Sequence, residues 1–157
     1  MFAIKYLSMF LMLVLGITVF TGCSEDEEVM TPAPSTSKVL VTHASPDAPG
    51  VDLLVDNVIA ATNLTFPNST AYATLNSGTR NVKVNVTGTS TTALQANLNL
   101  AADKNYSVFA VNNVASIEAV VLEDNLTAPA SGKAHIRFIH LSPNAPAVDI
   151  TLTDGTV

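Results

Sequence analysis

Asn81-Val82-Lys83-Val84-Asn85-Val86 alternates polar and apolar side chains without a break. Successive side chains of a β-strand point to opposite faces, so this period of two predicts a strand whose valines face a core. Thr87-Gly88-Thr89 follows directly and supplies turn-forming residues. Residues 94–100 then alternate again, with leucine or alanine at every even position. The region therefore predicts two neighbouring strands joined by a turn.

The same period of two extends over most of the chain beyond residue 38. Further strands are predicted at residues 39–41, 51–55, 71–75, 106–111 and 117–122. Valine and threonine, which suit a pleated and half-buried surface, are frequent there. No convincing helical period occurs after the N-terminal segment. Seven or eight short strands separated by turns indicate an all-β fold, an antiparallel β-sandwich of immunoglobulin-like type.

A ten-residue motif occurs twice in the chain. His43-Ala44-Ser45-Pro46-Asp47-Ala48-Pro49-Gly50-Val51-Asp52 recurs 97 positions later as residues 140–149, with seven identical residues. The flanking apolar alternation recurs as well, which favours two copies of one domain. We expect a first β-sandwich repeat over 38–127 and the start of a second, incomplete repeat over 133–157. The expectation is then that the sequence is a fragment of a longer protein; the alternative is an extra hairpin on the first domain.

The N-terminus has the pattern of an export signal. Lys5 precedes a fourteen-residue apolar run, Leu7 to Phe20, which is too short for a membrane-spanning helix. Phe20-Thr21-Gly22-Cys23 resembles the bacterial lipobox, in which small residues precede a cysteine that becomes acylated. We therefore expect residues 1–22 to be a cleaved lipoprotein signal peptide and Cys23 to carry lipid. An ordinary secretory signal and a short transmembrane helix stay open as alternatives.

The fifteen residues from Cys23 to Ser37 have the composition of a tether. Ser24-Glu25-Asp26-Glu27-Glu28 is acidic, and residues 29–37 are rich in Pro, Ser and Thr. Such segments lack the apolar surface needed to pack, so we expect a flexible, solvated spacer. The acidic run after the cysteine also resembles the surface-export signal of Bacteroidetes lipoproteins. We therefore expect the chain to be anchored in the outer membrane and exposed at the cell surface. A periplasm-facing lipoprotein is the alternative.

The net charge of the chain argues against one class of binding partner, nucleic acid. Removal of residues 1–22 leaves six basic and thirteen acidic residues, a net charge of −7. Four of the acids lie in the tether, so the rest of the chain carries a net charge of −3. A nucleic-acid-binding protein needs a basic stripe or patch to neutralise phosphates. We therefore predict no nucleic-acid partner.

The repeated motif and two internal stretches resemble a known family. His-x-Ser-Pro-[Asp/Asn]-Ala-Pro-x-Val-Asp followed by a strand is similar to the opening of DUF4397, a domain of unknown function common in exported bacterial lipoproteins. Residues 77–84 and 103–111 resemble the middle strands of that family. The resemblance covers nearly the whole mature chain and implies tandem, exported β-domains. It brings no established activity, so no catalytic residue is implied.

The motif contains the chain's candidate site residues. These are His43, Asp47 and Asp52 in the first copy, and His140 and Asp149 in the second. His43 shares the parity of the inward valines before it, so we interpret it as a buried histidine that bonds to the following turn. The two prolines stiffen this connection, and Asp47 is expected to accept from nearby backbone N–H groups as in an Asx-turn. Asp52 lies on the polar parity of the next strand.

A metal or catalytic site built from His43, Asp47 and Asp52 is the alternative interpretation. One histidine per copy is a poor set of zinc ligands, and no close carboxylate cluster supports calcium. We therefore predict no cofactor and no metal, with calcium binding left open. Ser45 lacks the Gly-x-Ser-x-Gly context of a hydrolase nucleophile.

These observations favour a non-enzymatic, lipid-anchored envelope protein that displays tandem β-sandwich modules as a stalk or adhesive array. Its expected partners are the membrane, through the N-terminal lipid, and a protein or glycan ligand at the cell surface. A carbohydrate-binding module for polysaccharide capture is the first alternative. A hydrolase that uses His43 with Asp47 or Asp52 is the second.

Overall fold

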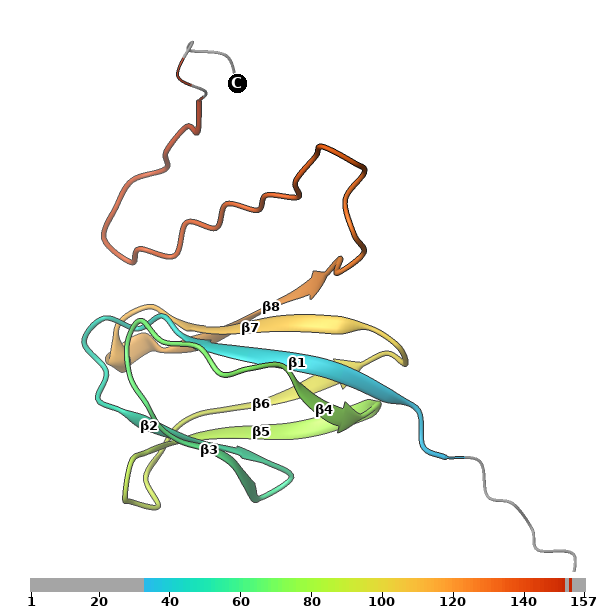
Figure 1. The fold of residues 1–157 in the computed structure, drawn as a ribbon. Coiled ribbons are helices and arrows are strands. Elements are labelled where there is room, and N and C mark those ends of the chain that lie inside the picture. The colour runs from blue at the N-terminus through green and yellow to red at the C-terminus, as the bar shows by residue number, and fades with distance from the viewer. Residues whose placement is uncertain (1–32, 152, 154–157) are drawn as a thin grey trace, which may run out of the picture. The chain divides into compact units, whose positions relative to one another are not determined.

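The computed structural model describes residues 33–151 and 153, and Figure 1 shows their arrangement. Residues 1–32, with the predicted signal peptide, Cys23 and most of the tether, lie outside the described residues. Eight strands form in the order β1 (Thr36–His43), β2 (Val51–Val55), β3 (Val58–Leu64), β4 (Ala73–Asn76), β5 (Gly78–Val86), β6 (Thr92–Leu100), β7 (Asn105–Val111) and β8 (Glu118–Asp124). A 3₁₀ turn, η1 (Val114–Ser116), precedes β8. No helix among the described residues is long and apolar enough to cross a membrane.

The strands make two four-stranded sheets, which confirms the predicted all-β sandwich. The first sheet has the order β4-β1-β7-β8 and the second has the order β3-β2-β5-β6. Strands β5 and β6 pair in antiparallel fashion, as the alternation over 81–100 predicts. One pairing departs from a wholly antiparallel arrangement, because β1 runs parallel to β7. Parallel neighbours need a long connection, and here the whole second sheet and β4 lie between the two strands in the chain.

The core lies between the two sheets and consists of the alternating apolar side chains. The buried residues of this core come from β1, β2, β5, β6 and β7; they are Val39, Val41, Val51, Leu53, Val82, Val84, Leu98, Leu100, Tyr106 and Val108. The members from β1, β2, β5 and β6 fall on the alternating apolar positions of the sequence, whereas Tyr106 and Val108 belong to the continuously apolar stretch of β7. Burial of a Val or Leu side chain contributes about 1.5–3 kcal/mol, so this cluster is the main source of stability in a domain without disulfides.

Strand β3 was not predicted from the sequence. Residues 58–64 read Val-Ile-Ala-Ala-Thr-Asn-Leu, which does not alternate, and most of the strand is exposed at the edge of its sheet. An edge strand with little buried surface needs no strict period of two. Strand β4 is also shorter than the predicted 71–75 and begins at Ala73. These two edge strands, β3 and β4, border a cavity.

The second motif copy forms no strand over residues 133–151. Ile136 and Phe138 are 74% and 67% exposed, whereas their counterparts Val39 and Val41 are buried in the core. The expected strands are therefore not seen, and neither is the alternative hairpin. Alternating apolar side chains form a stable strand only where a neighbouring sheet covers them, and Ile136 and Phe138 stay exposed although Arg137 between them bonds to β8. The proposed boundary between two repeats stays a prediction.

Candidate functional site

The motif loop, Ala44–Gly50, carries the chain from β1 in one sheet to β2 in the other. His43 ends β1 and is only 1% exposed. Its Nε2 lies 3.0 Å from the carbonyl oxygen of Pro49 at the far end of the loop. A carbonyl oxygen only accepts, so Nε2 is the protonated nitrogen that donates. The predicted inward histidine that bonds to its own turn is thus present in the structure.

The surroundings of the His43 ring are closed. Its Nδ1 is buried and has no hydrogen-bond partner among the described residues. The Phe66 ring meets the imidazole edge-on, with centroids 6.5 Å apart and planes at 74°. This aromatic contact covers the ring from the loop that joins β3 to β4. The histidine is therefore a packed part of the domain interior.

Asp47 connects the motif loop to a distant part of the chain. Its Oδ1 accepts from the backbone N–H of Val114 at 2.8 Å and, at 3.4 Å, from the hydroxyl of the fully buried Ser45. The expected Asx-turn to a nearby N–H is therefore wrong, because the strong donor lies 67 residues away at η1. Asp47 thus binds the β1–β2 connection to the β7–β8 connection. The asparagine at position 144 of the second copy retains a side-chain oxygen able to accept in the same way.

Asp52 joins three segments of the second sheet. Oδ1 accepts from Asn63 N at 2.9 Å and from Thr87 Oγ1 at 3.1 Å, and Oδ2 accepts from Gly88 N at 3.1 Å. The backbone hydrogen bond from Asn63, followed by the one from Gly88, lowers the pKa of the Asp52 carboxyl below its ordinary value near 3.8; burial opposes this shift and Thr87 adds to it. The carboxylate therefore acts as an acceptor that links β2, β3 and the β5–β6 turn.

The motif residues do not converge on one centre. His43 makes no hydrogen bond to Asp47 or Asp52 among the described residues; each binds a different part of the backbone. Within residues 33–151 and 153, no group of three His, Cys, Asp or Glu side chains is placed to hold a metal ion. The arrangement therefore favours the structural interpretation of the motif over a catalytic or calcium site.

The second copy reproduces part of this local geometry. His140 Nε2 lies 3.2 Å from the Pro146 carbonyl oxygen, with the same spacing of six residues as in the first copy. His140 and Asp149 are both exposed, and no hydrogen bond to the Asp149 carboxylate is seen among the described residues. The hydrogen bond from the histidine to the proline carbonyl therefore forms within the motif loop alone. The bonds of Asp52 require the neighbouring strand and turn of the second sheet.

A cavity of about 560 Å³ lies beside the core, along the edge strands β3 and β4. We call it the edge cavity; its lining residues are Val39, Val41, Leu53, Val55, Ala60, Ala61, Thr62, Asn63, Leu64, Thr65, Asn68, Thr70, Ala71, Tyr72, Ala73, Leu75 and Val82. Sequence reasoning missed it because β3 was not predicted. The one available signal is the group of alanines at 60, 61, 71 and 73, where small side chains leave space.

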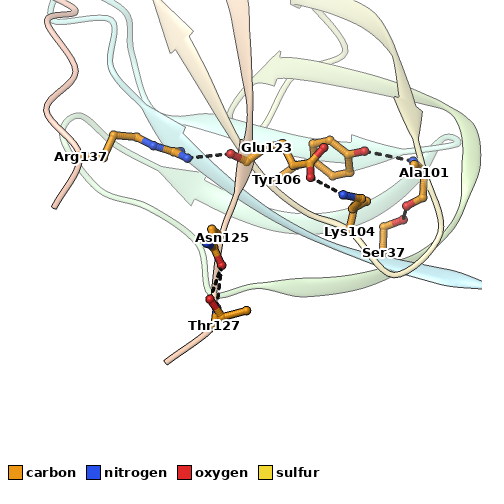
Figure 2. Close-up of polar contacts among 8 residues, drawn as sticks. All are labelled: Ser37, Ala101, Lys104, Tyr106, Glu123, Asn125, Thr127 and Arg137. Carbon is orange, nitrogen blue, oxygen red and sulfur yellow. Dashed lines mark hydrogen bonds and ion pairs between the residues drawn. The ribbon is translucent and has the colours of Figure 1, made fainter. Parts of the chain in front are cut away.

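A polar network lies along the β7–β8 pair, and Figure 2 shows part of it. Lys104 Nζ and Glu123 Oε1 are 2.6 Å apart, and this hydrogen bond and attraction raise the pKa of the Lys104 ammonium. Arg137, from the second motif segment, donates to the Glu123 carbonyl oxygen at 2.7 Å and pairs with the Asp124 carboxylate. The network therefore connects residues beyond the sandwich to its last strand.

Together, the two packed sheets and the histidine-closed motif loop define an all-β sandwich domain. The chain belongs to the family described as a domain of unknown function, DUF4397, whose profile matches residues 37–151. The matched range begins in β1 and includes both copies of the motif. A comparison with curated proteins found no match.

Proposed function

We propose that this chain is a non-enzymatic, lipid-anchored protein of the cell envelope, which displays its β-sandwich on the outer surface as a structural or adhesive module. The observation that supports the proposal is the hydrogen bonding of the motif side chains. Its histidine and both of its carboxylates are bonded to backbone groups of the domain itself. The most distinctive residues of the chain thus stabilise a fold and offer no reactive group.

The burial of His43 argues against the hydrolase alternative. A general base must lie within hydrogen-bond reach of a substrate proton. Nε2 of His43 is occupied by the Pro49 carbonyl, and Nδ1 is covered by protein. A substrate would have to open the motif loop and displace the Phe66 ring to reach this nitrogen. The motif therefore supports a structural role.

The anchor is argued from the sequence. Cys23 follows an apolar run of signal-peptide length and precedes an acidic spacer. A single acyl chain gives marginal membrane binding, whereas the two or three chains of a bacterial lipoprotein cysteine give lasting attachment. The sandwich begins at Thr36, thirteen residues after the cysteine. This spacer allows the domain to stand clear of the lipid headgroups.

The test combines a variant with protease treatment of intact source cells. Wild-type chain is expected in the membrane fraction, and external protease should remove its band on an immunoblot against residues 33–127. The Cys23→Ala chain should leave the membrane fraction, while a Ser24→Ala control should stay in it. A Cys23→Ala chain that stays with the membrane would overturn the lipid anchor. A wild-type band that survives protease, in cells whose surface controls are degraded, would place the domain in the periplasm.

The carbohydrate-binding alternative finds less support in the structure. Sugar-binding surfaces use exposed aromatic faces with polar groups beside them, whereas the edge cavity is lined mostly by aliphatic side chains and contains one aromatic ring, that of Tyr72. A glycan array probed with the full chain, with and without calcium, separates the two proposals. Specific and saturable glycan binding would replace the purely structural role.

A further inference from the structure

The edge cavity reaches from the sandwich surface to the core. Its floor is formed by the buried side chains of Val39, Val41, Leu53 and Val82. Half-buried Leu64 and Leu75 come from the two edge strands and form its walls. The other long side of the sandwich differs, because β6 and β8 contact each other there. One side of the core is therefore accessible from the surface, along β3 and β4.

The size of this cavity suits a small-molecule ligand. Ligand sites generally measure about 300–1,000 Å³, and the edge cavity measures about 560 Å³. An apolar cavity of about 150 Å³ already binds benzene. The space is therefore sufficient for a molecule several times that size.

The lining determines the chemistry of that ligand. No charged side chain lines the cavity, and its deep part is entirely aliphatic. Tyr72 is the only aromatic residue in the lining, and its hydroxyl donates to Asp124 at 2.8 Å. Burial, together with the bond to Asp124, raises the pKa of this hydroxyl, so it stays protonated and donates. A charged headgroup therefore has no side chain of opposite charge to pair with here, and a flat aromatic ligand has a single ring, that of Tyr72, to stack on.

Three polar residues of the lining, Asn63, Thr65 and Asn68, lie beside the motif loop: a Cβ on Gly50 would meet the first two, and the Asn68 carbonyl oxygen accepts from His43 N at 3.0 Å. The other polar residues of the lining are Thr62, Thr70 and Tyr72. Asn68 Nδ2 donates to Thr65 Oγ1, which fixes these two side chains as a pair. Amides and hydroxyls of this kind bind hydroxyl or ester groups without requiring a charge. The cavity thus has an aliphatic interior and a neutral polar end.

We propose that the edge cavity binds a neutral, single-chain amphiphile: its hydrocarbon chain lies over the valines of β1 and the leucines of β3 and β4, and its uncharged polar end meets Asn63, Thr65 and Asn68. The chain length is limited by the cavity to a medium chain. This assignment does not depend on the proposed envelope role, since it rests on the lining of the sandwich alone.

The test measures binding of radiolabelled monolauroylglycerol to the purified full chain by equilibrium dialysis, without a bilayer. Wild type is expected to show saturable binding of one molecule per chain. Lauric acid, which has the same chain length but a carboxylate, should bind at least tenfold more weakly. Equal binding of the two probes would overturn the neutral headgroup assignment.

Variants that fill the cavity locate the binding. Ala61→Leu and Ala73→Leu add side-chain volume inside the lining, and the double variant should lose at least tenfold in affinity. Ala115→Leu makes the same change on the exposed η1 turn and should bind as wild type does. Circular dichroism establishes that each variant is folded; should the double variant fail to fold, Ala73→Leu alone, at the exposed rim, gives the comparison. Undiminished binding to a folded cavity variant, or binding that never saturates, would overturn the proposal.

Discussion

His43 and its counterpart His140 make the same hydrogen bond, but only His43 is buried. In the first copy its ring is buried, bonded to Pro49 and covered by Phe66; in the second copy His140 makes the same bond at the surface. The same histidine–carbonyl hydrogen bond therefore occurs once in the protein interior and once at the surface. Comparing the two histidines shows how much burial adds to the stability that the residue contributes.

We expect His43→Ala to lower the free energy of unfolding by about 2–4 kcal/mol, because it removes a buried ring and leaves the Pro49 carbonyl without its donor. His140→Ala should change it by less than about 0.5 kcal/mol, as is usual for an exposed residue. Urea unfolding of the two full-length variants measures both values. A His43→Ala chain as stable as wild type would contradict the structural role and reopen the catalytic alternative.

At this scale the sequence predicts orientation well and distant partners poorly. The parity of His43 with Val39 and Val41 places it inward, and the structure confirms that. The partner of Asp47 was not predictable, since Val114 lies 67 residues away and only the fold brings the two together. A local pattern determines which face a side chain takes; it contains no information about which loop meets it there.

Among the elements, β2 gains side-chain bonds at its motif end in addition to its backbone pairing with β3 and β5. The Asp52 carboxylate accepts from the backbone N–H groups of Asn63 in β3 and Gly88 in the β5–β6 turn. These bonds are made to the carboxylate, and they hold its pKa in the folded state below the ordinary value. The charged form of Asp52 therefore favours the folded state.

The acid response of the domain should depend on this residue. A carboxylate with a lowered pKa in the folded state contributes stability that is fully present above its unfolded pKa of about 3.9 and is lost as the pH falls through the folded value. Asp52→Asn should therefore be less stable than wild type at pH 7, and the difference should shrink below about pH 4. Urea midpoints measured from pH 7 to pH 2.5 test this, with Asp149→Asn as the matched control in the second copy. A difference that stays constant over this range would show that charge on Asp52 is not involved.

The elements that the sequence predicts correctly are those that face the core. Strands β5, β6 and β7 alternate or are continuously apolar, and all three were predicted close to their observed positions. Strand β3 was missed because an edge strand is held by backbone bonds to β2, which any side chain permits. The edge cavity was missed with it, since a space between two edge strands is visible only when both are placed.

At the scale of the whole molecule, Asp124 connects the sandwich to the segment that follows it. Its side chain is 8% exposed and pairs with Arg137. The same carboxylate accepts from Tyr72 at 2.8 Å and from Ser107 at 2.7 Å, both within the sandwich. One acceptor thus serves two purposes: it accepts from two hydroxyls of the domain, and it holds the segment that leads to the second motif copy against β8.

Two substitutions separate these purposes. Arg137→Ala removes a half-exposed arginine, while the buried Asp124 carboxylate keeps its bonds from Tyr72 and Ser107, so the stability of the sandwich should fall by at most about 1 kcal/mol. It should nevertheless increase chymotrypsin cleavage after the exposed Phe138 several-fold, because the segment loses its bonds to Asp124 and Glu123. Asp124→Ala should increase the same cleavage and also lower stability by about 1–3 kcal/mol, since Tyr72 and Ser107 lose a charged acceptor. Lys133→Ala, on the same segment but outside this network, serves as the control for cleavage. If Arg137→Ala left cleavage unchanged, the pair with Asp124 would not be what holds the segment, and the two motif copies would be connected through the chain alone.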